Sequence, residues 1–257
     1  MIRYSFKIFC VAFSACFCCA GSLLAEDNNP HTDKMMNEKL NLTQEWDKVF
    51  PKSDKVTHRK VSFRNRYGIM LAADLYMPRN VNEKLPAIAV SGPFGAVKEQ
   101  SAGLYAQTMA ERGFLTIAFD PSYTGESGGF PRYVASPDIN TEDFCAAVDY
   151  LSTRDDVDSE RIGIIGICGW GGMAVNAAAI DTRIKAAVTS TMYDMSRVNA
   201  NGYFDAMDAD ARYELRKQLN AQRTADAKSG SYALAGGVPD PLPADAPGFV
   251  KDYYDYY

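Results

Sequence analysis

Hydrophobic residues in the middle of the chain form short continuous runs, and segments with helical spacing of apolar positions separate them. The runs are Ala87–Val90, Leu115–Phe119, Ile162–Gly166 and Ala186–Ser190. Runs of this length are typical of strands buried on both faces. The intervening segments predict helices over 100–112, 141–151 and 171–180. Strands that alternate with helices predict an α/β fold, a mostly parallel sheet with helices on both faces.

Two further strands precede this pattern. Val61–Phe63 and Met70–Tyr76 flank Asn65–Gly68, whose polar residues and glycine are typical of a hairpin turn. The sequence therefore assigns residues 56–198 to the core. Residues 26–55 are more polar and are expected to form a mobile N-terminal arm, with a helix near Leu40–Val49.

Beyond Asp194 the alternation of strands and helices stops. An amphipathic helix is expected over 208–222, and a stretch rich in glycine and proline follows it over 230–248. The last five residues, 253–257, include four tyrosines. We interpret residues 199–257 as a partial helical lid or a connecting segment, and we expect the sheet to be incomplete at its C-terminal side.

The N-terminal 25 residues are typical of a secretory signal peptide. Arg3 and Lys7 precede the apolar run Ile8–Ala20, and Ala25 supplies a small residue before a polar stretch. The sequence thus predicts an exported protein, periplasmic or secreted, with no membrane span after the signal is removed. A retained anchor is a less favoured alternative because about 20 apolar residues are needed to cross a bilayer. A lipid anchor at Cys16 is a second, weakly supported alternative.

Charge and cysteine content exclude several classes of function. The formal net charge is −5, and the lysines and arginines are scattered among acids, so a nucleic-acid partner is not expected. Only Cys145 and Cys168 lie outside the signal segment, which argues against a disulfide framework. The spacing of ligand residues predicts no metal site, and the glycines do not match a dinucleotide-binding pattern, so no cofactor is expected. The sequence leaves the oligomeric state open.

The candidate chemistry lies in the segment Gly166–Gly172, between a buried strand and a helix. This context is that of a nucleophile elbow, a sharp turn that presents a nucleophilic side chain and requires small neighbours. Cys168 is the only residue of the segment with a nucleophilic atom. We therefore predict Cys168 as the catalytic nucleophile. The alternative is a small buried residue that fills space under a glycine-rich turn.

Two backbone amides are candidates for an oxyanion hole. The amide of Gly169 opens the helix behind Cys168, where the helix dipole favours negative charge. The second donor is expected after the strand that ends near Val90; Pro93 has no N–H, so Phe94 is the first choice and Gly95 the second. Gly95, Trp170 and Asp120 are also predicted to line a substrate pocket. For Asp120 a structural role in the following turn is favoured over catalysis.

These residues carry a resemblance to a known family. The segment Gly166–Gly172, with Asp158–Arg161 before it and Asp181–Ala186 after it, resembles the dienelactone-hydrolase-like branch of the α/β-hydrolases. The loop Phe119–Gly129 is similar to a loop of the same family. The likeness covers approximately residues 61–194. It implies the hydrolase fold and a triad of nucleophile, acid and histidine in that chain order.

The histidines depart from this pattern, because His31 and His58 both precede Cys168 and are expected to be solvated. Two explanations compete: a chain that lacks the C-terminal part carrying the histidine, which we favour, or a protein that has lost hydrolase chemistry. The first predicts hydrolysis of a small ester, lactone or acylated compound in the complete protein, with weak or no activity in this chain. The second predicts a catalytically inactive binding protein. A relative of the prolyl-type peptidases is a further alternative.

Overall fold

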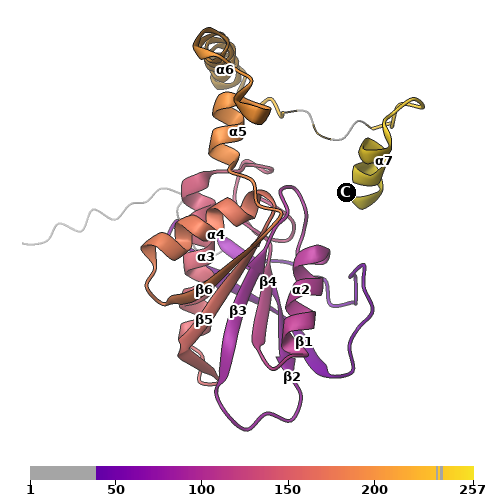
Figure 1. Ribbon diagram of the computed structural model, residues 1–257, viewed down its shortest axis with the longest axis vertical. Helices are drawn as coiled ribbons and strands as arrows, with labels where there is room; N and C mark the ends of the chain where they lie inside the picture. The colour runs from indigo at the N-terminus through magenta and orange to yellow at the C-terminus, as the bar shows by residue number, and fades with distance from the viewer. Residues whose placement is uncertain (1–38, 236, 238–239) are drawn as a thin grey trace, which may run out of the picture.

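A six-stranded sheet with the order β1-β2-β4-β3-β5-β6 forms the centre of the molecule (Figure 1). The computed structural model describes residues 39–235, 237 and 240–257. The strands are β1 (Val56–Arg64), β2 (Met70–Pro78), β3 (Leu85–Ser91), β4 (Leu115–Phe119), β5 (Val157–Ile167) and β6 (Ile184–Ser190). The helices are α2 (Ser101–Ala110), α3 (Pro137–Ser152), α4 (Gly169–Ile180), α5 (Met195–Asn201), α6 (Ala209–Ser229) and α7 (Gly248–Tyr256), with the 3₁₀ turn η1 (Tyr203–Asp205) after α5.

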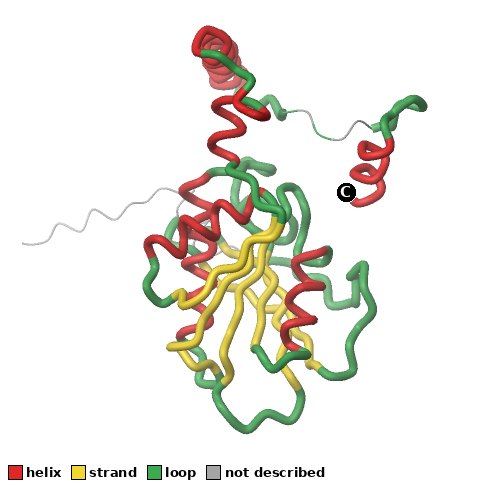
Figure 2. The backbone as a smooth tube through the Cα atoms, viewed as in Figure 1, coloured by secondary structure: helices red, strands yellow, loops and turns green. Residues whose placement is uncertain are grey.

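The directions of the strands bring four loops to one end of the sheet. Neighbouring strands in the series β4-β3-β5-β6 are parallel, whereas β1 and β2 form an antiparallel pair and β2 runs antiparallel to β4. The loops that follow β3, β4, β5 and β6 therefore meet at the upper end in Figure 2. In open α/β sheets the carboxyl ends of the strands are where ligands bind.

Each face of the sheet is covered by its own apolar layer. On one face, α3 and α4 bury side chains such as Phe144 and Met173 against Leu75, Ile117 and other strand residues. On the other face, the alanines of α2 pack against Tyr76, Ile88 and Val90. Because helices cover both faces, the central strands are apolar throughout and not alternating. This confirms the predicted α/β fold with helices on both faces.

Most of the predicted core elements are present, with longer ends than the sequence patterns indicated. The β3, β4 and β5 runs are buried as expected, but the expectation is wrong for Ala186–Ser190 in β6, which is largely exposed because β6 is an edge strand. Helix α3 begins earlier than predicted, at Pro137, because Ser136 caps it by accepting a hydrogen bond from the Ile139 amide. Helix α4 begins at Gly169, two residues earlier than predicted.

The prediction of a helix near Leu40–Val49 is wrong, since this segment has no regular secondary structure. Its aromatic residues pack against the folded core: Phe50 is buried, and Trp46 donates a hydrogen bond from Nε1 to the Phe50 carbonyl at 2.9 Å. Residues 39–55, assigned to the N-terminal arm, are thus in contact with the core. The expected signal peptide, and Cys16 with it, lies outside the described residues.

The segment after β6 extends away from the sheet. Helix α6 is longer than predicted and buries none of its residues, while α5 and α7 were not predicted at all. In Figure 1, α5 and α6 rise above the sheet, and α7 stands beside its upper end. Within the described part of the chain, no helix is long and apolar enough to cross a membrane.

Candidate active site

Cys168 occupies a sharp turn between β5 and α4. Its backbone angles are φ 56° and ψ −124°, a conformation that non-glycine residues rarely adopt. The turn is held by its neighbours: the Cys168 amide donates to the Ser190 carbonyl at 2.9 Å, and the Cys168 carbonyl accepts from the amides of Gly171 and Tyr193. The backbone thus has the strand-to-helix turn that the sequence predicts at this position.

Two glycines make this turn sterically feasible. A Cβ atom on Gly166 would lie 2.4 Å from the Trp170 carbonyl oxygen and 2.7 Å from the Ala174 Cβ. Gly92, with φ 99°, faces the elbow from the loop after β3, and a Cβ there would lie 2.4 Å from the Ile167 carbonyl oxygen. Any larger residue at either position would displace the elbow.

Gly169 and Phe94, the two residues whose amides are predicted to form the oxyanion hole, lie close to one another. A Cβ atom built on Gly169 would be 3.4 Å from the Cβ of Phe94, so the loop after β3 touches the first residue of α4. No hydrogen bond within the described residues uses the amide of Gly169 or of Phe94. Both donors therefore remain for an oxygen of a ligand, and the N-terminal end of α4 favours negative charge there.

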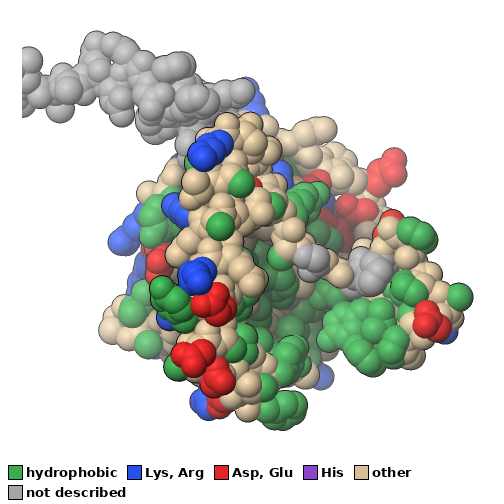
Figure 3. Space-filling view, turned by 90° about the horizontal axis from the view of Figure 1, so that it is seen from above, with side chains coloured by type: hydrophobic (Ala, Val, Ile, Leu, Met, Phe, Trp, Pro, Cys, Tyr) green, Lys and Arg blue, Asp and Glu red, His purple; other side chains and the backbone are tan. Residues whose placement is uncertain are grey.

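Cys168 opens into a cavity of about 500 Å³, which we call the cysteine cavity. Its wall on the sheet side comes from Pro93, Ile167, Thr191 and Tyr193. Its other wall comes from Asp252, Tyr253 and Tyr256 of α7 and from Tyr257, which follows α7. Figure 3, which looks down on this end of the molecule, shows hydrophobic side chains around the hollow there. A volume of this size holds a small organic substrate.

Helix α7 is attached to the rim of the cysteine cavity by hydrogen bonds. The Tyr257 hydroxyl donates to the Phe94 carbonyl at 2.8 Å, and Gln100 donates from Nε2 to the Tyr256 carbonyl at 2.6 Å. Burial, together with the nearby Cys168 thiol group, raises the pKa of Tyr257 to about 12. The phenol is therefore neutral at ordinary pH and acts as a hydrogen-bond donor.

A second cavity of about 300 Å³ lies on the other side of the loop after β3. We call it the arginine pocket; its walls include Phe94, Val97, Arg132, Tyr133, Val134 and Trp170. Gly95 and Trp170, both predicted to line a substrate pocket, lie here and not in the cysteine cavity. The rings of Phe94 and Trp170, both in the wall of this pocket, contact each other with their centroids 5.7 Å apart.

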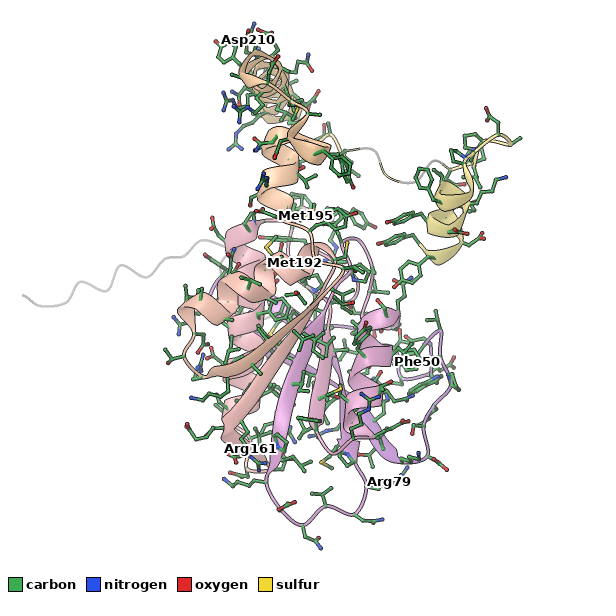
Figure 4. All side chains as sticks on the ribbon, viewed as in Figure 1. Phe50, Arg79, Arg161, Met192, Met195 and Asp210 are labelled. Carbon is green, nitrogen blue, oxygen red and sulfur yellow. The ribbon has the colours of Figure 1, made fainter. Side chains whose placement is uncertain are left out.

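Met192 and Met195, labelled in Figure 4, cover the elbow from the segment after β6. A Cβ atom on Gly169 would lie 3.0 Å from the Met195 Cγ, and one on Gly171 would lie 2.8 Å from the Met192 Cγ. The glycines that surround Cys168 thus also admit these two methionines. These two contacts were not predicted, because nothing in the spacing of the residues after Ser190 indicates that they reach the elbow.

Asp120 lies outside both cavities, contrary to the prediction that it lines a substrate pocket. Its side chain is fully buried, and its carboxylate accepts from the Lys98 amide at 2.7 Å and from Lys98 Nζ at 2.8 Å. Its Oδ2 also accepts from the Glu126 amide at 2.9 Å. Asp120 therefore connects the loop after β4 to the loop after β3, and its carboxylate lines neither cavity.

Lys98 is the centre of a buried ionic network that the sequence did not reveal. Its Nζ lies 2.6 Å from Glu99, 2.8 Å from Asp120 and 2.7 Å from Glu126. Burial disfavours the ammonium, but the three carboxylates outweigh this effect and raise the pKa of Lys98 above its usual value. Lys60 joins the same network through Glu126 at 2.8 Å.

His58 is not the solvated residue that the sequence suggested. Its Nε2 lies 2.8 Å from Asp74 Oδ1, and its ring contacts Trp46 and Tyr76. It lies on β1, four strands from β5 in the sheet, or about 19 Å at the usual strand spacing. His58 is therefore too far from Cys168 to act as its base, and His31 lies outside the described residues.

Cys145, on α3, provides a contrast to Cys168. Burial is the main cause that raises the pKa of the Cys145 thiol to about 11, and the neighbouring acids Asp181 and Glu142 add to it.

No group of three or more His, Cys, Asp or Glu side chains in the described part of the chain could hold a metal ion. This end of the sheet thus holds one thiol, two amides without a hydrogen-bond partner among the described residues, and two cavities.

Comparison with known proteins gives the wider context. The profile of the X-Pro dipeptidyl-peptidase (S15) family matches residues 67–235, which extend from just before β2 to beyond α6. The uncharacterized protein PA2218 of Pseudomonas aeruginosa is 64% identical over 222 residues, which cover 86% of this chain and 60% of that protein. The crystal structure of PA2218 superposes with a TM-score of 0.81 at 63% identity, over 86% of this chain and 69% of the other.

Two further proteins are more distant. The thiohydrolase aneE of Aspergillus aculeatus is 31% identical over 137 residues, 53% of this chain and 42% of its own length. The α/β hydrolase GrgF of Penicillium sp. sh18 shares the fold with a TM-score of 0.59 at 22% identity, over 69% of this chain and 57% of the other. The fold is thus that of the α/β hydrolases. This chain spans 60% of the length of its Pseudomonas relative.

Proposed function

The chain belongs to the X-Pro dipeptidyl-peptidase (S15) family, and on this premise we propose that it carries the acyl-transfer site of a hydrolase, with Cys168 as the nucleophile. The proposed substrate is a small acylated compound: a thioester, an ester or a lactone. The observation that carries the proposal is the position of Cys168, on a strained turn beside two unused amides and at the wall of a cavity. A residue that merely fills space does not require this backbone conformation.

In the proposed reaction the Cys168 thiolate attacks the acyl carbon of the substrate. The amides of Gly169 and Phe94 would donate to the oxyanion that forms. Collapse of this intermediate breaks the bond to the leaving group, which takes a proton from solvent and becomes a thiol or an alcohol; in a lactone the alcohol stays attached to the acyl chain. Water then hydrolyses the acyl-cysteine and restores the thiol.

Proton transfer to a general base is the step for which the described residues around Cys168 offer no suitable side chain. A positioned base contributes about 10²–10⁴-fold to such a step, and His58 is distant from Cys168. The N-terminal end of α4 stabilises negative charge that develops on the acyl oxygen during the attack. We therefore expect the 257-residue chain to form an acyl-cysteine readily but to hydrolyse it slowly or not at all.

Among the proposed substrates we favour thioesters, because one relative is named a thiohydrolase. The relative from Aspergillus aculeatus is a thiohydrolase, and its similarity covers 53% of this chain. A thiolate leaving group departs more easily than an alkoxide, which suits a site with a weak base. The more specific assignment to the dienelactone-hydrolase-like branch, and export from the cytoplasm, stay predictions.

The second candidate is a peptidase, which the match to the X-Pro dipeptidyl-peptidase family favours. An amide leaving group must be protonated as it departs, which demands a general acid near the scissile bond. Among the described residues around Cys168 no imidazole is available for this step, since His58 lies across the sheet. Hydrolysis of thioesters is therefore the function that the geometry supports better.

A substrate panel distinguishes these candidates. We would assay an acyl thioester, p-nitrophenyl acetate and glycyl-prolyl-p-nitroanilide with the wild-type chain and with Cys168→Ala and Cys168→Ser variants. The proposal predicts that the leaving group is released fastest from the thioester and slowest from the anilide, as a burst in the wild type that is absent in Cys168→Ala. Turnover that survives in Cys168→Ala would contradict the role of Cys168, and a preference for the anilide would favour the peptidase.

A further inference from the structure

The loop after β3, residues 92–100, carries the Phe94 amide that the proposed reaction needs, and we call it the oxyanion loop. The loop by itself fixes this amide weakly. Phe94 is 44% exposed, and Gly95, which follows it, has φ 82°, a region that glycine adopts freely. Across Phe94 the Ala96 amide donates to the Pro93 carbonyl at 3.1 Å. The position of the Phe94 amide therefore depends on contacts outside the loop.

Asp120 provides such a contact from the neighbouring strand β4. It follows the last residue of β4, and its own amide donates to the Ala72 carbonyl of β2 at 2.9 Å, so its backbone is part of the sheet. Its Oδ1 accepts from the Lys98 amide at 2.7 Å, and its Oδ2 accepts from Lys98 Nζ at 2.8 Å. The oxyanion loop is thus bound to the sheet through two atoms of Lys98, four residues after Phe94.

Phe94 has two further contacts on the side of the cavities. Its ring lies against that of Trp170, with centroids 5.7 Å apart, and its carbonyl accepts from the Tyr257 hydroxyl at 2.8 Å. A ring contact leaves the backbone free to turn, because the side chain rotates about its own bonds. Tyr257 follows α7, which buries none of its residues. Neither contact holds the backbone of the loop as firmly as two hydrogen bonds to a fully buried carboxylate.

Both partners of this ion pair are buried, with 0% of Asp120 and 1% of Lys98 exposed. A buried ion pair often adds no stability over an apolar pair of similar volume, because both charges lose their water. What it adds is direction, since each charge-assisted hydrogen bond has a narrow geometry. An oxyanion donor needs such precision, because a misplacement of about 1 Å can slow a reaction about 10²-fold.

We propose that Asp120 and Lys98 are positioning residues for acyl transfer, which hold the oxyanion loop so that its amide donor faces the oxyanion formed in the reaction. The donor is the Phe94 amide, and the inference rests on the proposed function of Cys168. Neither Asp120 nor Lys98 lines either cavity, so neither touches the substrate. The charge of Lys98 does not act on the oxyanion directly, because three carboxylates surround it.

Two reactions of the Cys168 thiol separate the oxyanion hole from other influences on this residue. Acetylation by p-nitrophenyl acetate passes through an oxyanion and needs its amide donors. Alkylation by iodoacetamide displaces iodide from a saturated carbon and forms no oxyanion. Both reactions depend on access to the thiol and on its ionisation. The ratio of the two rates, measured by peptide mapping with mass spectrometry, therefore reports on the oxyanion hole.

Asp120→Ala removes both hydrogen bonds to Lys98. We expect it to lower the ratio of acetylation to alkylation at least about tenfold, since loss of one oxyanion donor typically costs about 10²–10³-fold. Asp120→Asn keeps an oxygen that can accept from the Lys98 amide, so it should retain part of the ratio.

Asp143→Ala is the matched control. Asp143 is also a fully buried carboxylate, and it accepts from the Ser122 amide, in the same loop after β4, at 2.8 Å. None of its hydrogen-bond partners lies in the oxyanion loop. Asp143→Ala should therefore leave the ratio unchanged even though it removes a buried carboxylate.

Unfolding in urea separates a positioning role from a purely structural one. The Lys98→Met/Asp120→Leu variant replaces the ion pair by an apolar pair, which should restore much of the stability but not the hydrogen bond to the backbone of the loop. It should therefore keep a low ratio, and it replaces Asp120→Ala if that variant fails to fold. A ratio that recovers together with stability would show that the pair acts on stability alone and would overturn the proposal.

Amide hydrogen exchange observes the oxyanion loop itself. Peptides that cover residues 92–100 should exchange faster in Asp120→Ala than in the wild type, and at the wild-type rate in Asp143→Ala. An unchanged ratio or an unchanged exchange rate in Asp120→Ala would overturn the proposal. Absence of acetylation at Cys168 in the wild type would instead refute the proposed function, and the exchange rates would still decide whether Asp120 and Lys98 hold the loop.

Discussion

At the scale of single residues, the two cysteines of the folded core differ in their surroundings. Cys168 lines a cavity at the N-terminal end of α4, whereas burial beside acids raises the pKa of Cys145 to about 11. With a pKa near 11, only about one Cys145 in a thousand is a thiolate at pH 8. The thiolate is the species that reacts with alkylating reagents, so the two positions should differ in rate.

We therefore expect iodoacetamide at pH 8 to modify Cys168 much faster than Cys145. Peptide mapping by mass spectrometry at several times after mixing measures both rates in one sample. A Cys145→Ala variant controls for indirect effects and should leave the rate at Cys168 unchanged. Modification of the two cysteines at equal rates would contradict the assignment of Cys168 as the reactive thiol.

Gly166 offers a test of the elbow itself. Its Cβ position is only 2.4 Å from the Trp170 carbonyl oxygen, so Gly166→Val should destabilise the fold by at least about 2 kcal/mol. It should also slow alkylation of Cys168, because the turn must move. Urea unfolding measures the loss of stability. Gly248→Ala is a matched control, since nothing lies within 4 Å of its Cβ position, and a Gly166→Val protein as stable as this control would refute the close packing.

At the scale of secondary-structure elements, Lys98 joins the loop after β3 to the loop after β4. Removing one partner of a buried ion pair leaves an uncompensated charge and typically costs about 3–5 kcal/mol. We predict a loss of this size in the free energy of unfolding for Lys98→Met, because Asp120 is fully buried. Chemical denaturation measures it. Lys185→Met, on the exposed edge strand β6, should cost far less, and a Lys98→Met/Asp120→Leu double variant should recover much of the loss.

Glu126 makes the same network sensitive to acid. Burial disfavours its carboxylate, but hydrogen bonds from Lys60 and Lys98 outweigh burial and lower the pKa of Glu126 to about 2. The unfolded chain has a glutamate pKa of about 4.3. The contribution of Glu126 to stability is therefore fully present above about pH 4.3 and is lost as the pH falls toward 2.

Melting temperatures between pH 5 and pH 2 should consequently fall less steeply for Glu126→Gln than for the wild type. The Glu126→Gln protein is expected to be less stable at pH 5 because Lys60 and Lys98 lose a partner. Glu160→Gln is a suitable control, because the Glu160 side chain is 80% exposed. Identical acid profiles for the wild type and Glu126→Gln would show that this carboxylate does not govern acid stability.

These elements also show what the sequence could and could not predict. Strands such as Leu115–Phe119 were found because burial on both faces leaves a continuous apolar run. The elbow was found because Gly166 and Cys168 are close in sequence. The network around Lys98 was missed because its partners, up to 66 residues apart in the pair of Lys60 and Glu126, meet only in the folded sheet. Helix α7 was missed because a segment rich in glycine and proline precedes it.

At the scale of the whole molecule, α7 covers the cysteine cavity from a segment remote in sequence. Its attachment is a small set of hydrogen bonds to Phe94, Gln100 and Ser101. None of the residues of α7 is buried. Contacts of this kind are weak compared with a packed apolar interface, so α7 should leave the cavity readily.

We predict that a Tyr256→Phe/Tyr257→Phe double variant reacts faster with iodoacetamide at Cys168 than the wild type does. The change removes the hydroxyl groups that donate to Ser101 and to the Phe94 carbonyl but retains both rings. The rate at Cys168 measures the opening of the cavity. Tyr254→Phe, whose hydroxyl contacts Asp240 and not the cavity rim, is the control. An unchanged rate would show that α7 does not limit access to Cys168.

The most direct test of the central claim is the mass of the protein after it is mixed with an activated acyl donor. We would mix the chain with p-nitrophenyl acetate, stop the reaction at short times and map any acetyl group to a residue by mass spectrometry. The account predicts a single acetyl group on Cys168, none on Cys145, and no adduct in Cys168→Ala. An acetyl group on another residue, or an unmodified Cys168 in the folded wild-type protein, would contradict it.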